Sequence, residues 1–316
     1  MIGTPTVSVV SPVYGCADCL NKLFEEVRKA FDDTGVDWEL VLVDDRSRDN
    51  PWPLICDLAQ ADSRVRGIRL SRNHGQHLAI WAGLAAARGM WVAVIDCDLQ
   101  DDPAVIPVLY ATGKERKVEA IIVERGSWSD TWLRRFASRL FYRIINVLAG
   151  ISIKNAGNFG LYSRKLIDTL LRYEEQEVFL PMLVALTGLK SETYQLDRSE
   201  RSSGTSSYSF RRLLNMASAI IVRFSDRPLK ISVAVGFAFS FFSALISILL
   251  LILWLFGTFS VPGWTSTILS VWFLSGLIMA TLGVHGFYIG RVFAEVKRRP
   301  RIIVESTTDS PTRTQN

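Results

Sequence analysis

Residues 91–100, WVAVIDCDLQ, decide the fold that we expect for the first part of the chain. The first five residues are apolar and rich in β-branched side chains, which is typical of a strand buried on both faces of a sheet. Asp96 and Asp98 follow directly, one residue apart. Ligands of open α/β sheets bind beyond the carboxyl ends of the strands. The stretch therefore predicts a buried strand that brings two carboxylates to a binding edge.

The two carboxylates of this stretch suit a divalent cation. Carboxylate oxygens are ligands that Mg²⁺ and Mn²⁺ prefer, and a cation held there would neutralise a bound diphosphate. Gln100 adds a neutral oxygen to the same loop. An acidic pair after a strand also caps helices, and the next two aspartates, before Pro103, fit that structural role. We expect Asp96, Asp98 and Gln100 to hold Mg²⁺ or Mn²⁺.

Other short apolar runs lie on both sides of this strand in the sequence. They are Val7–Ser11, Glu39–Val43, Val65–Leu70 and Ala120–Val123. Helical patterns occupy Cys19–Phe31 and Gln76–Ala87 between them. Strands that alternate with helices form βαβ units and a mostly parallel, doubly wound sheet. We therefore expect one α/β domain over residues 1–208.

A second acidic pair, Asp44 and Asp45, follows the expected strand Glu39–Val43. A carboxylate there can accept hydrogen bonds from a ribose hydroxyl or from a base N–H. Pro12 and Tyr14 follow the first strand and would complete a nucleoside pocket at the same edge of the sheet. A turn with a helix N-cap is the structural alternative for the acidic pair.

The last third of the chain is strongly apolar, with no Asp, Glu, Lys or Arg from Ile231 to Gly290. Two spans, Ile231–Gly257 and Thr265–Gly290, each exceed the about 20 apolar residues that cross a bilayer. Basic residues flank the pair on both outer sides, so both ends are expected in the cytoplasm. We expect a two-helix transmembrane hairpin within residues 231–291. A basic cytoplasmic tail over residues 292–316 would follow, disordered after Pro300.

Two basic amphipathic segments precede the expected hairpin. In Trp132–Ile151, apolar residues recur every three or four positions, and three arginines are spaced four residues apart. Ser209–Phe224 has a similar pattern and runs into the apolar region. Such helices bind membrane surfaces, or pack on a core and leave the arginine face in solvent. We expect an interfacial helix over residues 209–230.

Charge and cysteine content narrow the classes of function. The formal net charge of +5 leaves nucleic acid, anionic lipid and phosphorylated ligands open as partners. The four cysteines, Cys16, Cys19, Cys56 and Cys97, are too few and too clustered for a disulfide scaffold and indicate a reducing compartment. No signal-peptide pattern occurs at the N-terminus, which also predicts a cytoplasmic catalytic domain.

The C-x-x-C run at residues 16–19 is compatible with two other functions, a redox site and a zinc site. Because it follows a strand, it fits a redox motif, and its cysteines together with His74 and His77 fit a zinc site. Neither an oxidoreductase nor a zinc protein accounts for the acidic pairs or for the apolar hairpin. His285, within a span, fits packing or an interhelical hydrogen bond better than proton transfer.

Several stretches together resemble a known family. They are VSVVSPVYG, VLVDDRSRDN, LSRNHGQHLAIWAGLAAARGMWVAVIDCDLQDDP, NAGNFGLYSRKLI and RSSGTSSYSFRRLLNMA, in this order and followed by two apolar spans. The chain resembles the family 2 inverting glycosyltransferases, and most of all the polyprenyl-phosphate branch. That branch contains dolichol-phosphate mannose synthases and bacterial undecaprenyl-phosphate glucosyltransferases. The resemblance extends to about Arg299 and implies a GT-A (Rossmann-like) nucleotide-sugar domain over residues 1–208, at the inner (plasma) membrane of the cell.

For the donor, the resemblance implies roles for particular residues of this chain. The acidic pair at the end of WVAVI and Gln100 would be the metal ligands, and Asp44 matches a position that contacts the nucleoside. Asn73 and Gly75 belong to a donor-binding loop in relatives. Arg201, in an R-x-x-G-x-S-x-Y stretch, matches an arginine that reaches the diphosphate. Arginine binds phosphate oxygens in pairs, which agrees with this role.

For the acceptor, the resemblance implies that Arg125, Arg134 and Ser138 hold a lipid phosphate. Asn158 stands where many relatives carry an aspartate, in a Gly-Asp-Phe run that would include a catalytic base. A phosphate monoester has a second pKa near ~6, so such an acceptor is already an oxyanion nucleophile without a base. The chain also reads Tyr14-Gly15-Cys16 where the family has Y-N-E, and Ser207 where relatives often carry lysine.

The expected function is metal-dependent, inverting transfer of a hexose from UDP-glucose to undecaprenyl phosphate, for cell-surface glycan assembly or modification. The expected partners are a nucleotide-diphosphate sugar, polyprenyl phosphate and the lipid bilayer, with no nucleic acid. Small residues in the spans permit a homo-oligomer. The alternatives are a GDP-sugar or modified UDP-sugar donor, and a non-catalytic membrane scaffold. A processive synthase is disfavoured, because the chain has no Q-x-x-R-W run.

Overall fold

The computed structural model describes residues 4–125, 157–176, 178–196, 227–256 and 263–309. Two compact units make up the chain. The first comprises Met1–Phe136, Ile151–Gly204 and Arg299–Asn316, and the second comprises Ala137–Gly150 and Thr205–Arg298. The described elements of the first unit are β1 Val7–Val13, η1 Ala17–Cys19, α1 Leu20–Asp32, β2 Trp38–Asp44, α2 Trp52–Ala61, β3 Val65–Leu70, α3 Gln76–Ala86, β4 Trp91–Val94, α4 Val105–Arg116, β5 Ala120–Arg125, β6 Gly160–Ser163, α6 Arg164–Leu171, α7 Leu180–Leu186, β7 Ser191–Leu196 and β8 Val304–Thr307.

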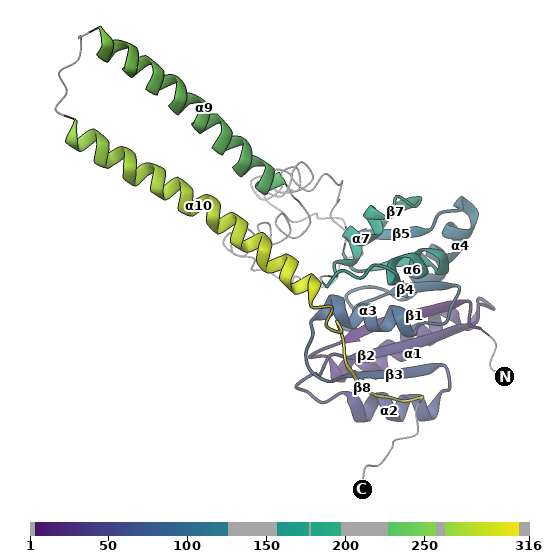
Figure 1. The fold of residues 1–316 in the computed structure, drawn as a ribbon. Coiled ribbons are helices and arrows are strands. Elements are labelled where there is room, and N and C mark those ends of the chain that lie inside the picture. Colours follow the sequence, from purple (N-terminus) through teal and green to yellow (C-terminus); the bar gives the residue numbers. More distant parts are fainter. Residues whose placement is uncertain (1–3, 126–156, 177, 197–226, 257–262, 310–316) are drawn as a thin grey trace. The chain divides into compact units, whose positions relative to one another are not determined.

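One sheet forms the centre of the first unit, with the strand order β7-β5-β6-β4-β1-β2-β3-β8 (Figure 1). Strand β1 pairs in parallel with β2 and β4, and β2 pairs in parallel with β3. Strands β6 and β8 run antiparallel to their neighbours, so the sheet is mixed. The five expected strands correspond to β1–β5 and the two expected helices to α1 and α3, which confirms the expected α/β fold, while the domain boundary at residue 208 stays a prediction.

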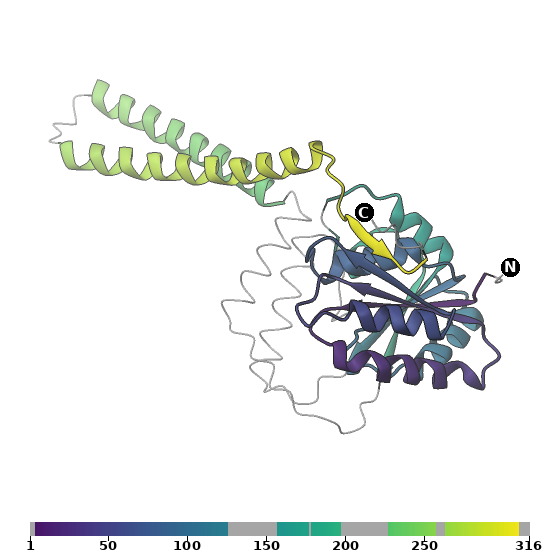
Figure 2. The same ribbon diagram turned by 90° about the horizontal axis from the view of Figure 1, so that it is seen from below.

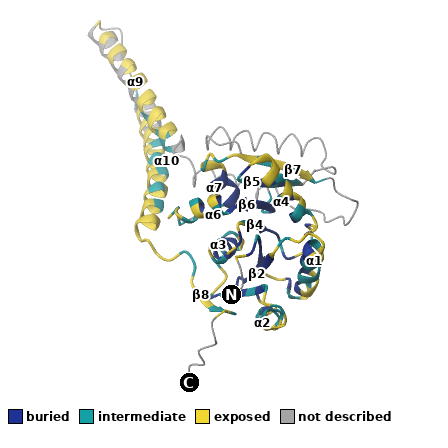
Figure 3. Cartoon of the chain, turned by 90° about the vertical axis from the view of Figure 1, so that its right-hand side faces the viewer, coloured by how far each residue is buried: buried dark blue, intermediate teal, exposed yellow. Residues whose placement is uncertain are grey.

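Helices cover both faces of this sheet. Helices α1, α2 and α4 pack on strand residues such as Val9 and Leu40, whereas α3, α6 and α7 pack on residues such as Val10 and Val41. Successive side chains of a strand point to opposite faces, so each strand supplies both cores. The central strands β2, β4 and β6 are dark blue, hence buried, in Figure 3, whereas the edge strand β7 is exposed or half-buried. Both faces are therefore covered, as the continuous apolar runs of the sequence predict.

Helix α3 lies close to the sheet because it carries a glycine where it crosses β1. A Cβ atom at Gly83 would lie 2.3 Å from Cγ1 of Val10 and 3.1 Å from Cγ2 of Val43. Only a glycine permits this approach. At the start of α3, Gly75 precedes the helix with a φ of 92°.

The segment after Pro300 is folded, so the expected disorder is wrong for residues 301–309. Strand β8 pairs antiparallel with β3, with Ile68 opposite Thr307, and forms one edge of the sheet (Figure 2). Strand β8 has the sequence VEST, of which only Val304 is apolar. Its partner strand lies more than 230 residues earlier in the chain. Local sequence carries no information on such a distant pairing, which explains the error.

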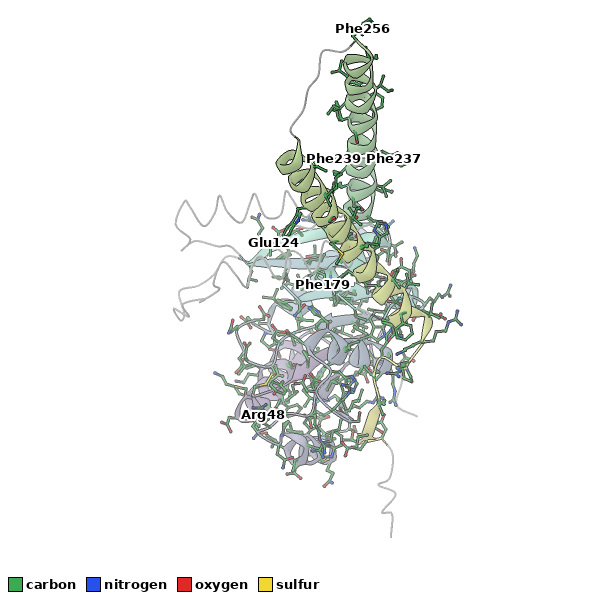
Figure 4. All side chains as sticks on the ribbon, turned by 60° about the vertical axis from the view of Figure 1, so that its left-hand side comes forward. Arg48, Glu124, Phe179, Phe237, Phe239 and Phe256 are labelled. Atoms are coloured by element: carbon green, nitrogen blue, oxygen red, sulfur yellow. A yellow bond between two sulfur atoms is a disulfide. The ribbon has the colours of Figure 1, made fainter. Side chains whose placement is uncertain are left out.

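The second unit contains two long helices, α9 Arg227–Leu255 and α10 Trp264–Val296. Within α10, Ser270–Val296 is long and apolar enough to cross a membrane, with a mean hydropathy of 1.5. Phe239 of α9 packs against Phe273 of α10, with ring centroids 5.9 Å apart, and Phe237 also extends from α9 (Figure 4). The helices are largely exposed in Figure 3. The expected helices are present, and a crossing by both of them stays a prediction.

The expected amphipathic segments within residues 132–151 and 209–224 lie outside the described residues. The loop between the two long helices does too.

Candidate active site

A cavity of about 490 Å³ opens at the carboxyl edge of the sheet, where the ends of β1 and β4 lie side by side. Four segments line it: residues 12–16 at the end of β1 and directly after it, Asp45 after β2, residues 73, 75 and 76 before and in α3, and residues 96–98 after β4. The residues of the predicted site among them are Pro12, Tyr14, Asn73, Gly75, Asp96 and Asp98. The structure therefore brings the expected metal pair Asp96 and Asp98, the expected nucleoside residues Pro12 and Tyr14, and the donor loop to one cavity, but not Asp44.

The acidic pair after β4 is held by two glutamines. The Gln76 side chain donates a hydrogen bond to Oδ1 of Asp96 at 2.7 Å, and the Gln100 backbone N–H donates to Oδ1 of Asp98 at 3.1 Å. Leu99 between them has a φ of 59°, a left-handed conformation that turns the loop. Gln100 itself is not part of the cavity lining, so its role as a metal ligand stays a prediction. Sequence reasoning missed Gln76, although its place at the start of the helix after the donor loop is a signal for such a role.

The pair Asp96 and Asp98 fits a divalent cation whose remaining coordination positions are filled by water and by substrate phosphate oxygens. Among the residues that the structure describes, no three His, Cys, Asp or Glu side chains gather at one point. Mg²⁺ needs fewer than three protein ligands, because it keeps several waters and is usually bound by one or two carboxylates together with substrate phosphates. Asp96 and Asp98 meet that requirement in a cavity with room beside them.

A disulfide joins Cys16 and Cys97 in the wall of this cavity, with Cα atoms 6.5 Å apart. This differs from the expectation of reduced cysteines, which holds for Cys19 and Cys56. The two bonded cysteines are 81 residues apart in sequence and meet only because β1 and β4 are neighbours. The C-x-x-C redox pair is thus replaced by another pairing. The zinc alternative is also excluded, since Cys16 is bonded and the ring of His77 packs on Phe179 at 5.0 Å.

The two aspartates after β2 have different surroundings. Asp45 lines the cavity, and its carboxylate accepts the backbone N–H groups of His74 at 2.7 Å and Gly75 at 2.8 Å. Asp44 is 1% exposed and lies outside the lining, where its Oδ1 accepts the Ser47 N–H at 2.8 Å. Burial raises the pKa of both carboxyls, against the hydrogen bonds that lower it. The nucleoside contact of Asp44 stays a prediction, and Asp45 is an additional candidate.

The loop after β2 also supports the loop after β1. The side-chain oxygen of Ser47 accepts the backbone N–H of Gly15 at 2.7 Å, and a carboxylate oxygen of Asp49 accepts the N–H of Ala17 at 2.7 Å. Ser47 donates its own hydroxyl hydrogen to Asp49. Gly15 and its neighbours form part of the cavity wall, so the position of that wall depends on the loop that begins at Asp44.

The remaining predicted residues are at the same sheet edge or outside the described part. Asn158 precedes β6 and is half-buried, and the next residue accepts a backbone hydrogen bond from Val123 of β5 at 3.0 Å. It therefore lies beside the carboxyl end of β5 but not in the cavity lining. Arg125 ends β5. Arg134, Ser138 and Arg201 lie outside the described residues, so their roles stay predictions.

Known proteins that are similar in sequence to this chain are glycosyltransferases, as the sequence predicts. The family model described as glycosyl transferase family 2 matches residues 8–171, which include every residue of the cavity lining. The "Uncharacterized glycosyltransferase YkcC" of Bacillus subtilis (strain 168) is 32% identical over 301 residues, covering 95% of this chain and 93% of its own. The "Undecaprenyl-phosphate 4-deoxy-4-formamido-L-arabinose transferase" of Proteus mirabilis (strain HI4320) is 33% identical over 306 residues, covering 95% and 93%.

Among solved structures, the mannosyltransferase PcManGT from Pyrobaculum calidifontis, in complex with GDP-Man and Mn²⁺, matches with a TM-score of 0.45 and 14% identity. It covers 95% of this chain and 89% of its own. The two sequence relatives match over almost their whole length. Their similarity therefore extends beyond the catalytic unit to the C-terminal helices.

Proposed function

This chain belongs to glycosyl transferase family 2, and from that premise we propose that it transfers a hexose from UDP-glucose to undecaprenyl phosphate. The observation that carries the proposal is the cavity in which Asp96 and Asp98 face the loops after β1 and before α3. The name of the Proteus mirabilis relative supports the acceptor. That name also favours a second candidate for the transferred sugar, 4-deoxy-4-formamido-L-arabinose, for which we propose a modified UDP-sugar donor.

The cavity suits a nucleoside diphosphate. Its volume of about 490 Å³ is within the usual range for small-molecule sites. Tyr14 is 48% exposed and offers a ring face to a base, while the buried Asp45 orders the opposite loop. Asp96 and Asp98 would hold Mg²⁺ or Mn²⁺, which neutralises the diphosphate leaving group when bound. Asn73 and Gly75 would approach the donor through their backbone.

The acceptor phosphate would attack the anomeric carbon directly, which inverts its configuration. A neutral amide cannot take a proton as a base, so Asn158 would orient the sugar or the phosphate. The acceptor does not need a base, because a phosphate monoester is largely ionised at neutral pH, with a second pKa of about 6. Positioning by Arg125, Arg134, Ser138 and Arg201 would then supply most of the rate enhancement.

The apolar helices would place this reaction at a membrane. Ser270–Val296 of α10 supports one crossing, and α9 would provide the second, with the catalytic unit and both termini in the cytoplasm. The product would be a lipid-monophosphate sugar on the cytoplasmic side.

A donor screen tests the proposal. The full chain in detergent is incubated with undecaprenyl phosphate, Mg²⁺ or Mn²⁺, and a panel of UDP- and GDP-sugars that includes both candidate donors. We expect lipid-linked product from one donor, and its loss with EDTA. Nucleotide release without a lipid product would refute the acceptor, and no turnover with any donor would favour the scaffold alternative.

Two aspartate variants make the screen specific. Asp98→Asn removes a carboxylate from the cavity and should abolish transfer. The matched control is Asp102→Asn, since Asp102 is an exposed aspartate of the same loop that caps a turn by accepting the Ala104 N–H at 2.9 Å. Full activity of the Asp98 variant would exclude the metal assignment.

A further inference from the structure

We propose that residues 301–309, which follow the apolar helices, form a positioning element of the donor cavity, and that Glu305 is its principal positioning residue. The inference rests on the proposed function, since it takes the cavity to be the site of a nucleotide sugar. These residues lie beyond the range 8–171 that the family model matches. They nevertheless belong to the unit that contains the cavity.

The segment holds the strand that leads into the donor loop. The Ser71 N–H donates to the Ile303 carbonyl at 2.9 Å, directly after the end of β3. At the other end of the pairing, the Thr308 N–H donates to the Gly67 carbonyl at 3.0 Å, and the Thr308 hydroxyl accepts the Gly67 N–H at 2.9 Å. Because β3 continues into residues 71–75, these bonds set where the donor loop begins.

A second anchor lies on the donor loop itself. Burial lowers the pKa of the His74 imidazole, whereas the backbone of Arg301 raises it, so the two residues are neighbours. The Arg301 guanidinium lies 5.0 Å from the ring centroid of Trp81, in α3, and donates a hydrogen bond to the Tyr173 carbonyl. His74 is held from the other side by the carboxylate of Asp45, which lines the cavity. The first residue of the segment is therefore one contact away from the cavity wall.

Glu305 acts on the opposite wall through two arginines. Its carboxylate forms an ion pair with Arg46 and lies 3.8 Å from Nε of Arg69. That Nε lies 3.4 Å from Oδ2 of Asp44, and neither of these two buried atoms has a hydrogen-bond partner among the described residues. The Nε of Arg69 thus lies between the carboxylates of Glu305 and Asp44 and is hydrogen-bonded to neither.

The position of Arg69 matters because Asp44 begins the loop that supports the cavity. Asp44 accepts the Ser47 N–H, and Ser47 accepts the N–H of Gly15 in the cavity wall. Arg46, between them, has a φ of 56°, which a non-glycine residue adopts only when its surroundings hold it. Without Glu305, Arg46 loses its ion-pair partner and Arg69 is drawn onto Asp44. We expect the loop to shift, and the Gly15 wall with it.

The test compares two carboxylates of the same segment. Glu305→Gln removes the one that faces Arg46 and Arg69. Asp309→Asn is the matched control, because Asp309 pairs with Arg66 at 2.6 Å and with Arg88 at 3.1 Å at the opposite end of β3. Kinetics with UDP-glucose at saturating undecaprenyl phosphate, and thermal denaturation, are measured for the full chain in detergent.

The Glu305–Arg46 side chains are 41% and 42% exposed, so we expect a rise in donor KM of about fivefold for Glu305→Gln, the upper range for a partly exposed pair. Turnover at saturating donor should stay within about twofold. Asp309→Asn should lower the melting temperature without changing donor KM. Arg46→Gln alone should also raise donor KM. In the double variant Glu305→Gln/Arg46→Gln, donor KM should rise no further than in Glu305→Gln alone, because the two substitutions remove the same ion pair.

Three outcomes would overturn the inference. They are an unchanged donor KM in Glu305→Gln, an equal rise in donor KM in Glu305→Gln and in the control Asp309→Asn, and additive effects of Glu305→Gln and Arg46→Gln on donor KM in the double variant. If the wild-type chain turns over no nucleotide sugar, the proposed function fails and the inference fails with it. If the wild-type chain is active and Glu305→Gln is indistinguishable from it, only the inference fails.

Discussion

Replacing Asp45 with asparagine tests whether the loop before α3 is ordered by a carboxylate. In the wild-type chain one carboxylate accepts two backbone N–H groups, at 2.7 Å and 2.8 Å, and it is 2% exposed. Asparagine retains one acceptor oxygen, so one of the two N–H groups would face an amide NH₂ group. A buried donor left unpaired costs about 1–3 kcal/mol.

An opposing effect reduces this cost. Burial raises the pKa of Asp45, which means that the folded chain pays to keep the carboxylate charged, and a neutral amide removes that penalty. We therefore take the lower half of the range, about 1–2 kcal/mol, which corresponds to a rise in donor KM of roughly tenfold. The loop must be ordered when the donor binds, so the loss should appear in donor KM before it appears in turnover.

The assay is donor KM at saturating lipid acceptor, together with thermal denaturation. Asp62→Asn is the control, because Asp62 also accepts a backbone N–H, from Arg64 at 2.8 Å, but lies outside the cavity lining. Both variants should lower the melting temperature, by about 2–4 °C per kcal/mol for a domain of this size. A donor KM within twofold of wild type in Asp45→Asn, alongside a lowered melting temperature, would refute the proposed role of the loop.

Three further predictions concern neighbouring features. Gln76→Ala removes the hydrogen bond to the first carboxylate of the acidic pair and should raise the Mn²⁺ concentration needed for half-maximal activity about tenfold, as a metal titration would show. Gly83→Ala places a Cβ 2.3 Å from Cγ1 of Val10 and should destabilise the catalytic unit by about 1–3 kcal/mol in thermal denaturation, whereas Gly286→Ala, with open space around it, should not. The hydrogen bond from Arg64 lowers the pKa of Asp62 below its ordinary 3.8, so its stabilisation is present above that pH and is lost as the pH falls through the lowered value; Asp62→Asn should lose less stability than wild type on acidification below pH 3.8.

The central strands could be predicted because their sequences determine them locally. Each run is short, rich in apolar and β-branched residues and bounded by turn residues, a pattern that is typical of a buried strand and has no helical period. The acidic pair at 96 and 98 could be placed for the same reason, since the end of a parallel strand marks the binding edge.

The places of Asp44 and Asp45 differ from the expectation because the strand before them ends one residue later than the sequence predicts. The sequence predicts that the strand ends at Val43, whereas β2 continues through Asp44. Side chains alternate along a strand, and Leu40 and Leu42 point to the core shared with α1, so Asp44 follows them inward. Asp45 is the first residue beyond the strand and takes the cavity position. Strand ends are uncertain by more than one residue from sequence alone, so this distinction needs the structure.

The disulfide and Gln76 escaped prediction for a different reason. Each depends on which segments become neighbours, and residues 16, 76 and 97 share no local pattern. Only the order of strands in the sheet brings them together.

The position of β8 in the chain has a consequence for biosynthesis. The hydrogen bond between Gly67 and Thr308 joins residues 241 positions apart. At about 5–20 residues per second, the ribosome needs roughly 10–50 s to make the intervening chain, and both apolar helices emerge in that interval. Until then the outer edge of β3 has no partner and can pair with another nascent chain. The catalytic sheet is therefore completed only after both apolar helices have been made, and a chain that stops before β8 would keep the outer edge of β3 exposed to aggregation and to proteolytic quality control.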